Sequence, residues 1–310
     1  MDDAPSGLAD MEPLALFDDQ AWRFDHVLGL GSATMRLKIA CDHFDDLMLA
    51  VYGPAIQKHT GRRDVGSRLE VVAIDDSYWL RRDGSCVTGP FNHHGAYLEM
   101  QRHLLSAAHA PRRTDLVIHA SAIVDEDSDA SIVLAGDSGS GKSSLTAAFL
   151  SRGYGFVADD TAIIDADTEE VWCLRLPLRL KEGTWQRIQP YVSESFESWE
   201  AIVEPEGRKI WRLYPKRDLS QTQSFAPPPH AILFPVYEPD AATEISRIEP
   251  LAALALIVES GAWFETNEPA MADIIDWLLR TRCYSVIYSS AENVVTAIED
   301  QLRSDVTSAV

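Results

Sequence analysis

Eight consecutive residues near the middle of the chain have the types and spacing of a loop that binds phosphate groups. They run from Gly136 to Ser143 and read Gly-Asp-Ser-Gly-Ser-Gly-Lys-Ser, which fits the pattern G-x-x-x-x-G-K-[ST]. In such a loop, glycines let backbone N–H groups turn towards phosphate oxygens, and the following helix adds its positive N-terminal end. The stretch therefore predicts binding of a nucleoside triphosphate.

The side chains of this stretch have separate expected roles, with ATP and Mg²⁺ as the expected cofactors. Lys142 is expected to neutralise the β- and γ-phosphates, and Ser143 is expected to ligate the Mg²⁺ that bridges them. The full set of predicted nucleotide contacts in the loop is Gly136, Asp137, Ser138, Gly139, Ser140, Gly141, Lys142, Ser143 and Ser144.

The elements around the loop must be a strand before it and a helix after it. Residues 131–135 form a short apolar run with β-branched residues, and residues 144–150 are apolar with helical periodicity. A second apolar strand at 156–158 ends in two adjacent carboxylates, Asp159 and Asp160. A strand that ends in aspartate beside a phosphate loop is where Mg²⁺ or a catalytic base belongs.

Cations are concentrated downstream of the aspartate pair. They could form a positive wall around a triphosphate or an acidic substrate, or they could neutralise nearby glutamates at the surface, and the sequence leaves both readings open. Lys181 is the favoured individual, because it follows an alternating run that should continue the sheet next to the loop. The nine basic residues are Arg175, Arg179, Lys181, Arg187, Arg208, Lys209, Arg212, Lys216 and Arg217.

Composition limits the class of protein. The chain has 310 residues, 46% of them hydrophobic, and 27 basic against 48 acidic residues give a net charge of −21. Such a charge argues against nucleic acid or an anionic membrane as a partner. The four cysteines form no C-x-x-C pair and are expected to be buried free thiols. No signal peptide or membrane span is recognised, so a cytoplasmic protein is expected.

Three regions are expected along the chain. Residues 1–20 are acidic and predict a flexible lead-in, residues 21–113 predict a small α+β domain, and residues 114–310 predict an α/β domain with a mixed sheet that contains the loop. In the small domain the pattern predicts strands at 35–41, 69–74, 78–82 and 85–88, and helices at 45–52 and 96–108. Its histidines, His93, His94, His103 and His109, have no metal-ligand spacing and are expected at the surface.

In the second domain the sequence predicts one strand over 116–124 and a hairpin over 162–174 that turns at Asp167 and Thr168. Residues 221–229 are expected to form a polar, proline-rich loop. The remaining expected elements are strands at 231–237 and 284–288 and helices at 250–260, 273–280 and 291–303.

The motifs resemble those of a known kinase family. The loop at 136–143, the pair Arg152-Gly153, the run Val157-Ala158-Asp159-Asp160 and His119 at the end of a strand together resemble the catalytic domain of HPr kinase/phosphorylase. The likeness is closer to the related kinases that share a fold with nucleotide-dependent phosphoenolpyruvate carboxykinases. It is specific over about 115–165, is weaker towards the C-terminus, and does not cover the first hundred or so residues.

The resemblance implies phosphoryl transfer to a serine hydroxyl. It implies Asp159 as the base, Asp160 as a residue that helps to hold Mg²⁺, and His119 as the histidine near the transferred phosphate, in agreement with the need for a carboxylate within reach of the alcohol nucleophile. The segment 175–183 lacks the Glu-x-Arg-Gly-x-Gly signature of true HPr kinases. The resemblance therefore does not establish phosphorolysis, or HPr as the acceptor.

The expected function is that of an ATP- and Mg²⁺-dependent kinase that acts on serine in a peptide or small protein, such as a precursor peptide. A kinase for a small molecule with a hydroxyl group, and a nucleotide-binding regulator with little catalysis, remain as alternatives. The N-terminal domain is expected to shape acceptor binding or to mediate homo-oligomerisation.

Overall fold

The structure is a computed structural model in which two units are distinguished. It describes residues 13–18, 20–30, 33–41, 44, 48–49, 52–56, 66–109, 116–125, 127–174, 176–203, 207–262, 264 and 266–307. Unit 1 comprises residues 1–111 together with 203–208, and unit 2 comprises residues 112–202 together with 209–310. Most of the expected lead-in, residues 1–12 and 19, lies outside the described residues. No helix in the described ranges is long and apolar enough to cross a membrane.

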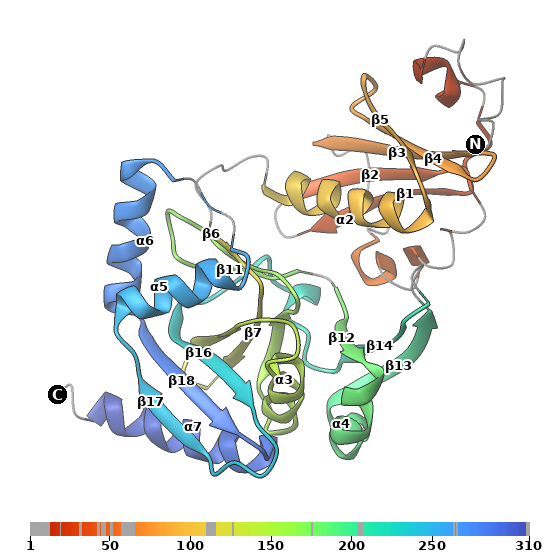
Figure 1. Cartoon of the computed structure of the whole chain (residues 1–310). Helices are drawn as coiled ribbons and strands as arrows, with labels where there is room; N and C mark the ends of the chain where they lie inside the picture. Colours follow the sequence, from red (N-terminus) through yellow and green to blue (C-terminus); the bar gives the residue numbers. More distant parts are fainter. Residues whose placement is uncertain are drawn as a thin grey trace, which may run out of the picture. The chain divides into compact units, whose positions relative to one another are not determined.

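Unit 1 is built on a five-stranded sheet with the order β1-β2-β3-β4-β5 (Figure 1). Its strands are β1 (Phe24–Leu30), β2 (Ala33–Ile39), β3 (Ser67–Ile74), β4 (Ser77–Arg82) and β5 (Cys86–Phe91). Strands β2 and β3 are parallel, and the other neighbours are antiparallel. Helix α2 (His93–His109) buries Ala96, Tyr97, Met100 and Leu104, and short 3-10 turns lie at η1 (Pro13–Phe17) and η2 (Gly53–Ala55).

Three expectations for this unit need correction or lie beyond the described residues. His103 is buried rather than at the surface, and it lies beside Glu99 with 3.2 Å between Nε2 and Oε1. Cys86 is exposed, whereas Cys41, Cys173 and Cys283 are buried and free as expected. Within the predicted helix at 45–52, residues 45–47, 50 and 51 lie outside the described residues.

The central sheet of unit 2 has six strands in the order β17-β18-β16-β8-β7-β9. Strands β8, β16 and β18 are parallel, so their carboxyl ends lie at one edge, and β17, β7 and β9 run antiparallel to their neighbours. The strands are β7 (Ala120–Asp125), β8 (Ala130–Ala135), β9 (Gly155–Ala158), β16 (Pro229–Tyr237), β17 (Glu244–Arg247) and β18 (Arg282–Tyr288).

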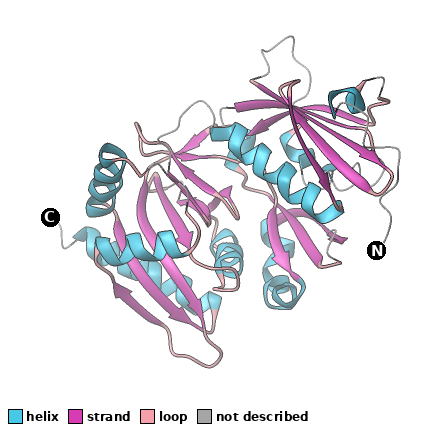
Figure 2. Cartoon of the chain, turned by 45° about the horizontal axis from the view of Figure 1, so that its top comes forward, coloured by secondary structure: helices cyan, strands magenta, loops and turns pink. Residues whose placement is uncertain are grey.

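Alternation along the strands places apolar side chains on both faces of this sheet, and helices cover each face (Figure 2). On β8, Val133 belongs to the cluster that packs against helices α5 (Pro250–Glu259) and α6 (Glu268–Arg280). Its neighbours Ile132 and Leu134 belong to the cluster with α3 (Lys142–Ser151) and α7 (Ala291–Thr307). A sheet buried on both faces explains why these strands read as continuous apolar runs.

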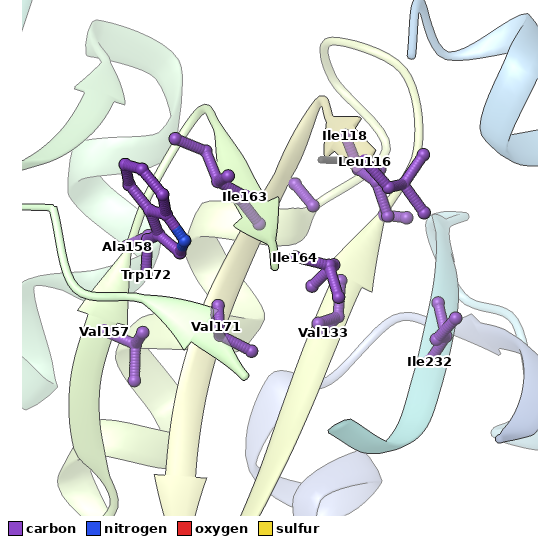
Figure 3. Close-up of a cluster of buried hydrophobic side chains, with 14 of the residues drawn as sticks. Leu116, Ile118, Val133, Val157, Ala158, Ile163, Ile164, Val171, Trp172 and Ile232 are labelled. Carbon is purple, nitrogen blue, oxygen red and sulfur yellow. The ribbon is translucent and has the colours of Figure 1, made fainter. Parts of the chain in front are cut away.

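A second sheet of four short strands, ordered β15-β11-β10-β6, is antiparallel throughout. Its strands are β6 (Leu116–Ile118), β10 (Ala162–Ile164), β11 (Val171–Trp172) and β15 (Phe225–Ala226). The hairpin expected over 162–174 is present as β10 and β11, and β15 interrupts the loop expected over 221–229. Figure 3 shows Ile163, Ile164, Val171 and Trp172 of this sheet gathered with Val133 and Ile232 of the central sheet.

The single strand expected over 116–124 is two strands in two sheets. β6 pairs with β10 in the second sheet, and β7 pairs with β8 and β9 in the central sheet. The chain changes direction between them at His119, which is a bend. Since apolar periodicity does not reveal which partner a strand takes, the break could not be seen in the sequence.

A third sheet, ordered β12-β14-β13, was not expected. It contains β12 (Leu178–Lys181), β13 (Phe196–Val203) and β14 (Lys209–Pro215), and helix α4 (Glu182–Ser195) follows β12 directly. Lys181 therefore ends a strand of this separate sheet and does not continue the central sheet. A 3-10 turn, η3 (Leu219–Gln221), leads on towards β15.

Candidate functional site

The predicted phosphate loop connects β8 to α3, and two of its glycines are fixed by their surroundings. We call residues 136–141 the glycine loop. Gly136 has φ 146° and Gly141 has φ 102°, in the region that side chains other than glycine rarely adopt. A Cβ at Gly141 would lie 2.2 Å from Tyr288 Oη. Backbone conformation and packing therefore both require glycine at position 141.

Two tyrosines at the carboxyl ends of the parallel strands hold the glycine loop from beneath. Tyr288, the last residue of β18, donates its hydroxyl to Gly141 O at 2.9 Å. Tyr237, the last residue of β16, donates its backbone N–H to Ser140 O at 3.0 Å. The two loop carbonyls are therefore fixed by neighbouring strands of the same sheet.

Lys142 begins α3 and folds back over the loop. Its buried ammonium group donates to Gly136 O, and to Asp137 O at 2.9 Å. Burial lowers the pKa of Lys142, and the negative charges of Asp159 and Asp160 oppose that shift. Next to it on α3, Ser143 is half-buried and Ser144 is buried.

Asp159 directly follows β9 and is buried, with 4% of its surface exposed. Ser121 on β7 donates its hydroxyl to Asp159 Oδ1 at 2.5 Å, and the backbone N–H of Arg179 donates to Oδ2 at 2.9 Å. Burial raises the pKa of the Asp159 carboxyl, and the charge of Asp160 raises it further, against the two hydrogen bonds. Asp159 therefore takes up a proton more readily than an ordinary aspartate.

Asp160 has the opposite character. It lies two residues beyond the end of β9 with a left-handed φ of 64°, and 49% of its side chain is exposed. His119 Nε2 lies 3.1 Å from Oδ1, and Arg179 Nη1 donates to Oδ2 at 2.9 Å. Although burial acts to raise its pKa, the His119 hydrogen bond and the Arg179 charge outweigh burial and hold the pKa of Asp160 well below its usual range. The two adjacent carboxylates are thus tuned in opposite directions.

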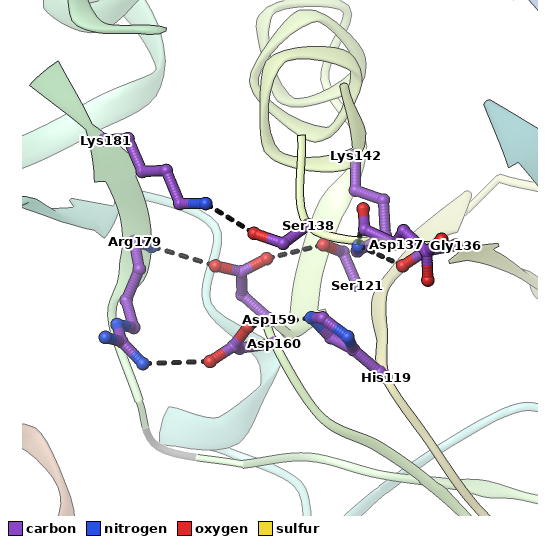
Figure 4. Close-up of polar contacts among 10 residues, drawn as sticks. All are labelled: His119, Ser121, Gly136, Asp137, Ser138, Lys142, Asp159, Asp160, Arg179 and Lys181. Carbon is purple, nitrogen blue, oxygen red and sulfur yellow. Dashed lines mark hydrogen bonds and ion pairs between the residues drawn. The ribbon is translucent and has the colours of Figure 1, made fainter. Parts of the chain in front are cut away.

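Arg179 and Lys181 reach this group from β12 (Figure 4). Because they are two residues apart on a strand, they share a face. Arg179 contacts both aspartates, with its backbone for Asp159 and its guanidinium for Asp160, while Lys181 Nζ donates to Ser138 Oγ in the glycine loop. The third sheet therefore brings two cations to the elements that the sequence had placed together.

The residues that the sequence analysis did not single out are Arg179 and Ser121. Arg179 lies two positions before Lys181 on β12, so strand alternation was a signal that pointed to it. Ser121 lies on β7, beyond the bend at His119, and no local pattern connected it with the site.

The group of nine cations does not act as a unit. Arg179 and Lys181 lie at the site, whereas Lys209 lies 3.8 Å from Glu182. Lys216 Nζ donates to Ser193 O and Glu194 O, and Arg217 donates to Gly153 O beyond the end of α3. Arg175 lies outside the described residues. Neither of the two readings of the sequence therefore holds for the whole set.

Several features of the glycine loop fit a polyphosphate. The Ser140 hydroxyl is buried, with no hydrogen-bond partner in the described part of the chain. No side chain caps the N-terminus of α3, so the N–H groups of its first turn remain available to an anion. A Cβ at Gly139 would meet nothing within 4 Å, so there is space at the tip of the loop.

The donors available for Mg²⁺ are hard oxygens, which this ion prefers: the Ser143 hydroxyl and the Asp160 carboxylate. Among the described residues, no group of three or more His, Cys, Asp or Glu side chains could hold a metal ion. These donors fit an ion that completes its coordination with phosphate oxygens and water rather than one held in a cage of side chains.

Comparison with known proteins gives a distant likeness in fold. No protein-family model matches the chain, and no curated protein matches it. Among solved structures, the HPr(Ser) kinase/phosphatase from Coxiella burnetii is similar, with 12% sequence identity and a TM-score of 0.29, over 62% of this chain and 97% of that chain. The resemblance is at the level of the fold only.

Proposed function

We propose that this chain is an ATP- and Mg²⁺-dependent kinase that transfers the γ-phosphoryl group to a hydroxyl, that of a serine in a peptide or small protein. The observation that carries the proposal is the meeting of the glycine loop and Lys142 with a pair of carboxylates whose pKa values are shifted apart. Loops of this type cradle phosphates, and oppositely tuned carboxylates are typical of sites that move protons.

The cations of the site would bind and orient the phosphates. Lys142 at the start of helix α3, and Lys181 and the guanidinium of Arg179 on strand β12, supply positive charge around the glycine loop. Ser143 and Asp160 are the proposed ligands of Mg²⁺, which when bound would neutralise charge that develops on the transferred group. His119 would hold Asp160 in position through its 3.1 Å contact.

Asp159 is the proposed acceptor of the hydroxyl proton. Its raised pKa brings it closer to the operating pH, where a general base is most effective. Each of its oxygens already accepts one hydrogen bond, but a carboxylate oxygen has a second lone pair, so an incoming hydroxyl can still be bound.

One observation favours a second candidate, a nucleotide-binding regulator with little catalysis. Asp159 is almost fully buried, and Ser121 and Arg179 occupy both of its oxygens. In a regulator, a carboxylate held in this way would fix β12 beside β7 and would contact no substrate.

Variants of the full chain separate the two candidates. The protein is incubated with γ-labelled ATP, Mg²⁺ and a panel of serine peptides and small hydroxyl compounds, and ATP affinity is measured separately by calorimetry. For a kinase, Asp159→Asn should lower label transfer by about a hundredfold or more with little change in ATP affinity. The control Asp167→Asn changes an exposed aspartate in the β10–β11 turn and should leave transfer unchanged.

Two results would reject the proposal in different ways. If the protein binds ATP but transfers label to no acceptor, and Asp159→Asn changes neither measurement, the chain is a nucleotide-binding regulator and not a kinase. ATP affinity that persists in Lys142→Ala would remove the glycine loop as the phosphate site, because an ammonium hydrogen bond to a charged group is worth about tenfold to a hundredfold in affinity.

A further inference from the structure

A cavity lies at the opposite edge of the central sheet from the glycine loop. It has a volume of about 490 Å³, within the range of small-molecule sites. Ala130 at the start of β8, His230 near the start of β16 and Arg282 at the start of β18 line it. The glycine loop begins where β8 ends, roughly 20 Å away at about 3.3 Å per residue. The cavity is therefore separate from the proposed kinase site.

Arg282 is the cation of this cavity that the rest of the described chain does not neutralise. Two other arginines line the cavity, but Arg280 is paired with Glu169, and Arg303 lies 3.4 Å from Asp300. Within the described ranges, the Arg282 guanidinium makes no hydrogen bond or ion pair. A half-buried guanidinium with five donors and no acceptor favours an anion brought from outside.

The carboxylates of the cavity have donors of their own. Asp125 accepts the Ser128 hydroxyl at 2.7 Å and the Asp127 N–H at 3.2 Å. Glu299 is hydrogen-bonded to the Tyr154 hydroxyl. Both acids thus have donors other than Arg282, and the guanidinium N–H groups of Arg282 are left for a ligand.

His230 supplies an acceptor next to this cation. Its Nδ1 must donate to Ser131 O, 2.8 Å away, because a carbonyl oxygen can only accept. Burial, helped by the nearby Arg282, lowers the pKa of His230 against the Ser131 hydrogen bond and the charge of Asp125, so above pH 6.5 the ring is neutral and Nε2 carries a lone pair. An anionic head that also carries an O–H group would be bound by both residues.

The walls of the cavity beyond these two residues are partly apolar. Ile132 and Leu302 are buried core residues that line it, and the ring of Tyr154 adds an aromatic face. We propose that this cavity is a binding site for a small organic anion, a carboxylate or a phosphate monoester, with its head on Arg282 and an apolar body against Ile132, Leu302 and Tyr154. His230 Nε2 would accept the O–H of a monoprotonated phosphate, a hydrogen bond that a carboxylate cannot make.

The proposal is tested with phenyl phosphate and 3-phenylpropionate as probes and neutral 3-phenylpropanol as the control, by ligand-observed NMR titration of the full chain. At least one anion should bind saturably and the alcohol should not, and the two anions distinguish a phosphate site from a carboxylate site. Arg282→Gln should weaken binding by about tenfold or more, because a charged hydrogen bond is lost. Arg247→Gln removes an exposed arginine of the adjacent strand β17, outside the cavity, and should have no effect.

Two further measurements keep the test decisive. Lys142→Ala should leave anion binding intact, which separates this cavity from the glycine loop. Phenylglyoxal, which modifies arginine, should be excluded from Arg282 but not from Arg247 by the bound anion, as mapped by mass spectrometry, and this requires no variant to fold. Failure of both anions to bind, or unchanged binding in a folded Arg282→Gln variant, would overturn the proposal.

Discussion

Replacement of Gly141 by alanine should destabilise the protein more than the same replacement at Gly139, and the difference should come from Tyr288. The two glycines have nearly equal φ angles, 102° and 97°, so the backbone strain of a left-handed alanine, about 1–2 kcal/mol, applies to both. The gain from a less flexible unfolded chain also applies to both. Only at position 141 does the added Cβ meet another group, because it would lie 2.2 Å from Tyr288 Oη, whereas at position 139 nothing lies within 4 Å.

The expected costs follow from these two contributions. Gly139→Ala should lower the free energy of unfolding by about 1–2 kcal/mol, and Gly141→Ala by about 2–5 kcal/mol once an overpacking cost of about 1–3 kcal/mol is added. Equilibrium unfolding in urea, with circular dichroism as the signal, measures both values.

A double-mutant cycle assigns the difference to its cause. Tyr288→Phe removes the atom nearest to the new Cβ and leaves the ring Cζ at 3.0 Å, so Gly141→Ala should cost less in that background. Equal costs for Gly139→Ala and Gly141→Ala, or a cycle with no coupling, would refute this account of the loop.

Three more predictions concern the charged groups of the site. Asp160→Asn should lower the free energy of unfolding at pH 7 by less than about 1 kcal/mol, because the side chain is half exposed. Since the native pKa of Asp160 is below its usual value, this difference should shrink as the pH falls below 3.8, which urea titrations at pH 7 and pH 3 would detect. Ser121→Ala should cost about 1–3 kcal/mol at pH 8 and less at pH 3.8, because the lost hydrogen bond serves the ionised Asp159, whose pKa lies above 3.8 so that its carboxyl is mostly protonated at that pH; an equal cost at both values would contradict this. Lys181→Met should weaken ATP binding by about tenfold in calorimetry, whereas Lys209→Met, which removes a lysine beside Glu182, should not; equal effects would exclude Lys181 from the site.

The parts of the site that the sequence predicted are those whose signals are local. The glycine loop, its strand and helix, and the strand that ends in Asp159 and Asp160 each depend on a short stretch with a fixed spacing, and each lies where the pattern placed it. The helices near the C-terminus were visible because one face of each is apolar, as in α6 with Ile274, Trp277 and Leu278 buried.

The remainder depends on pairings between distant residues, which a local pattern does not contain. β12 pairs with β14 through Leu178 and Leu213, and helix α4, which contains a proline, lies between the two strands in the sequence. Because the paired strands are far apart in the chain, the sequence showed only a concentration of basic residues in this region and no sheet. The role of Arg179 follows from that pairing and from the position of the third sheet. The bend at His119 was hidden for the same reason, since β6 and β7 differ only in the strands they join.

The tyrosines beneath the glycine loop have a consequence for the direction of its amide groups. In a trans peptide the C=O and the N–H point in opposite directions. Tyr237 binds the carbonyl of Ser140 and Tyr288 that of Gly141, so the N–H groups of Gly141 and Lys142, which share those peptide units, must point away from the strands. Two donors are thereby held in position before any anion binds. The conformational entropy lost in fixing them is lost when the protein folds, so it does not weaken anion binding.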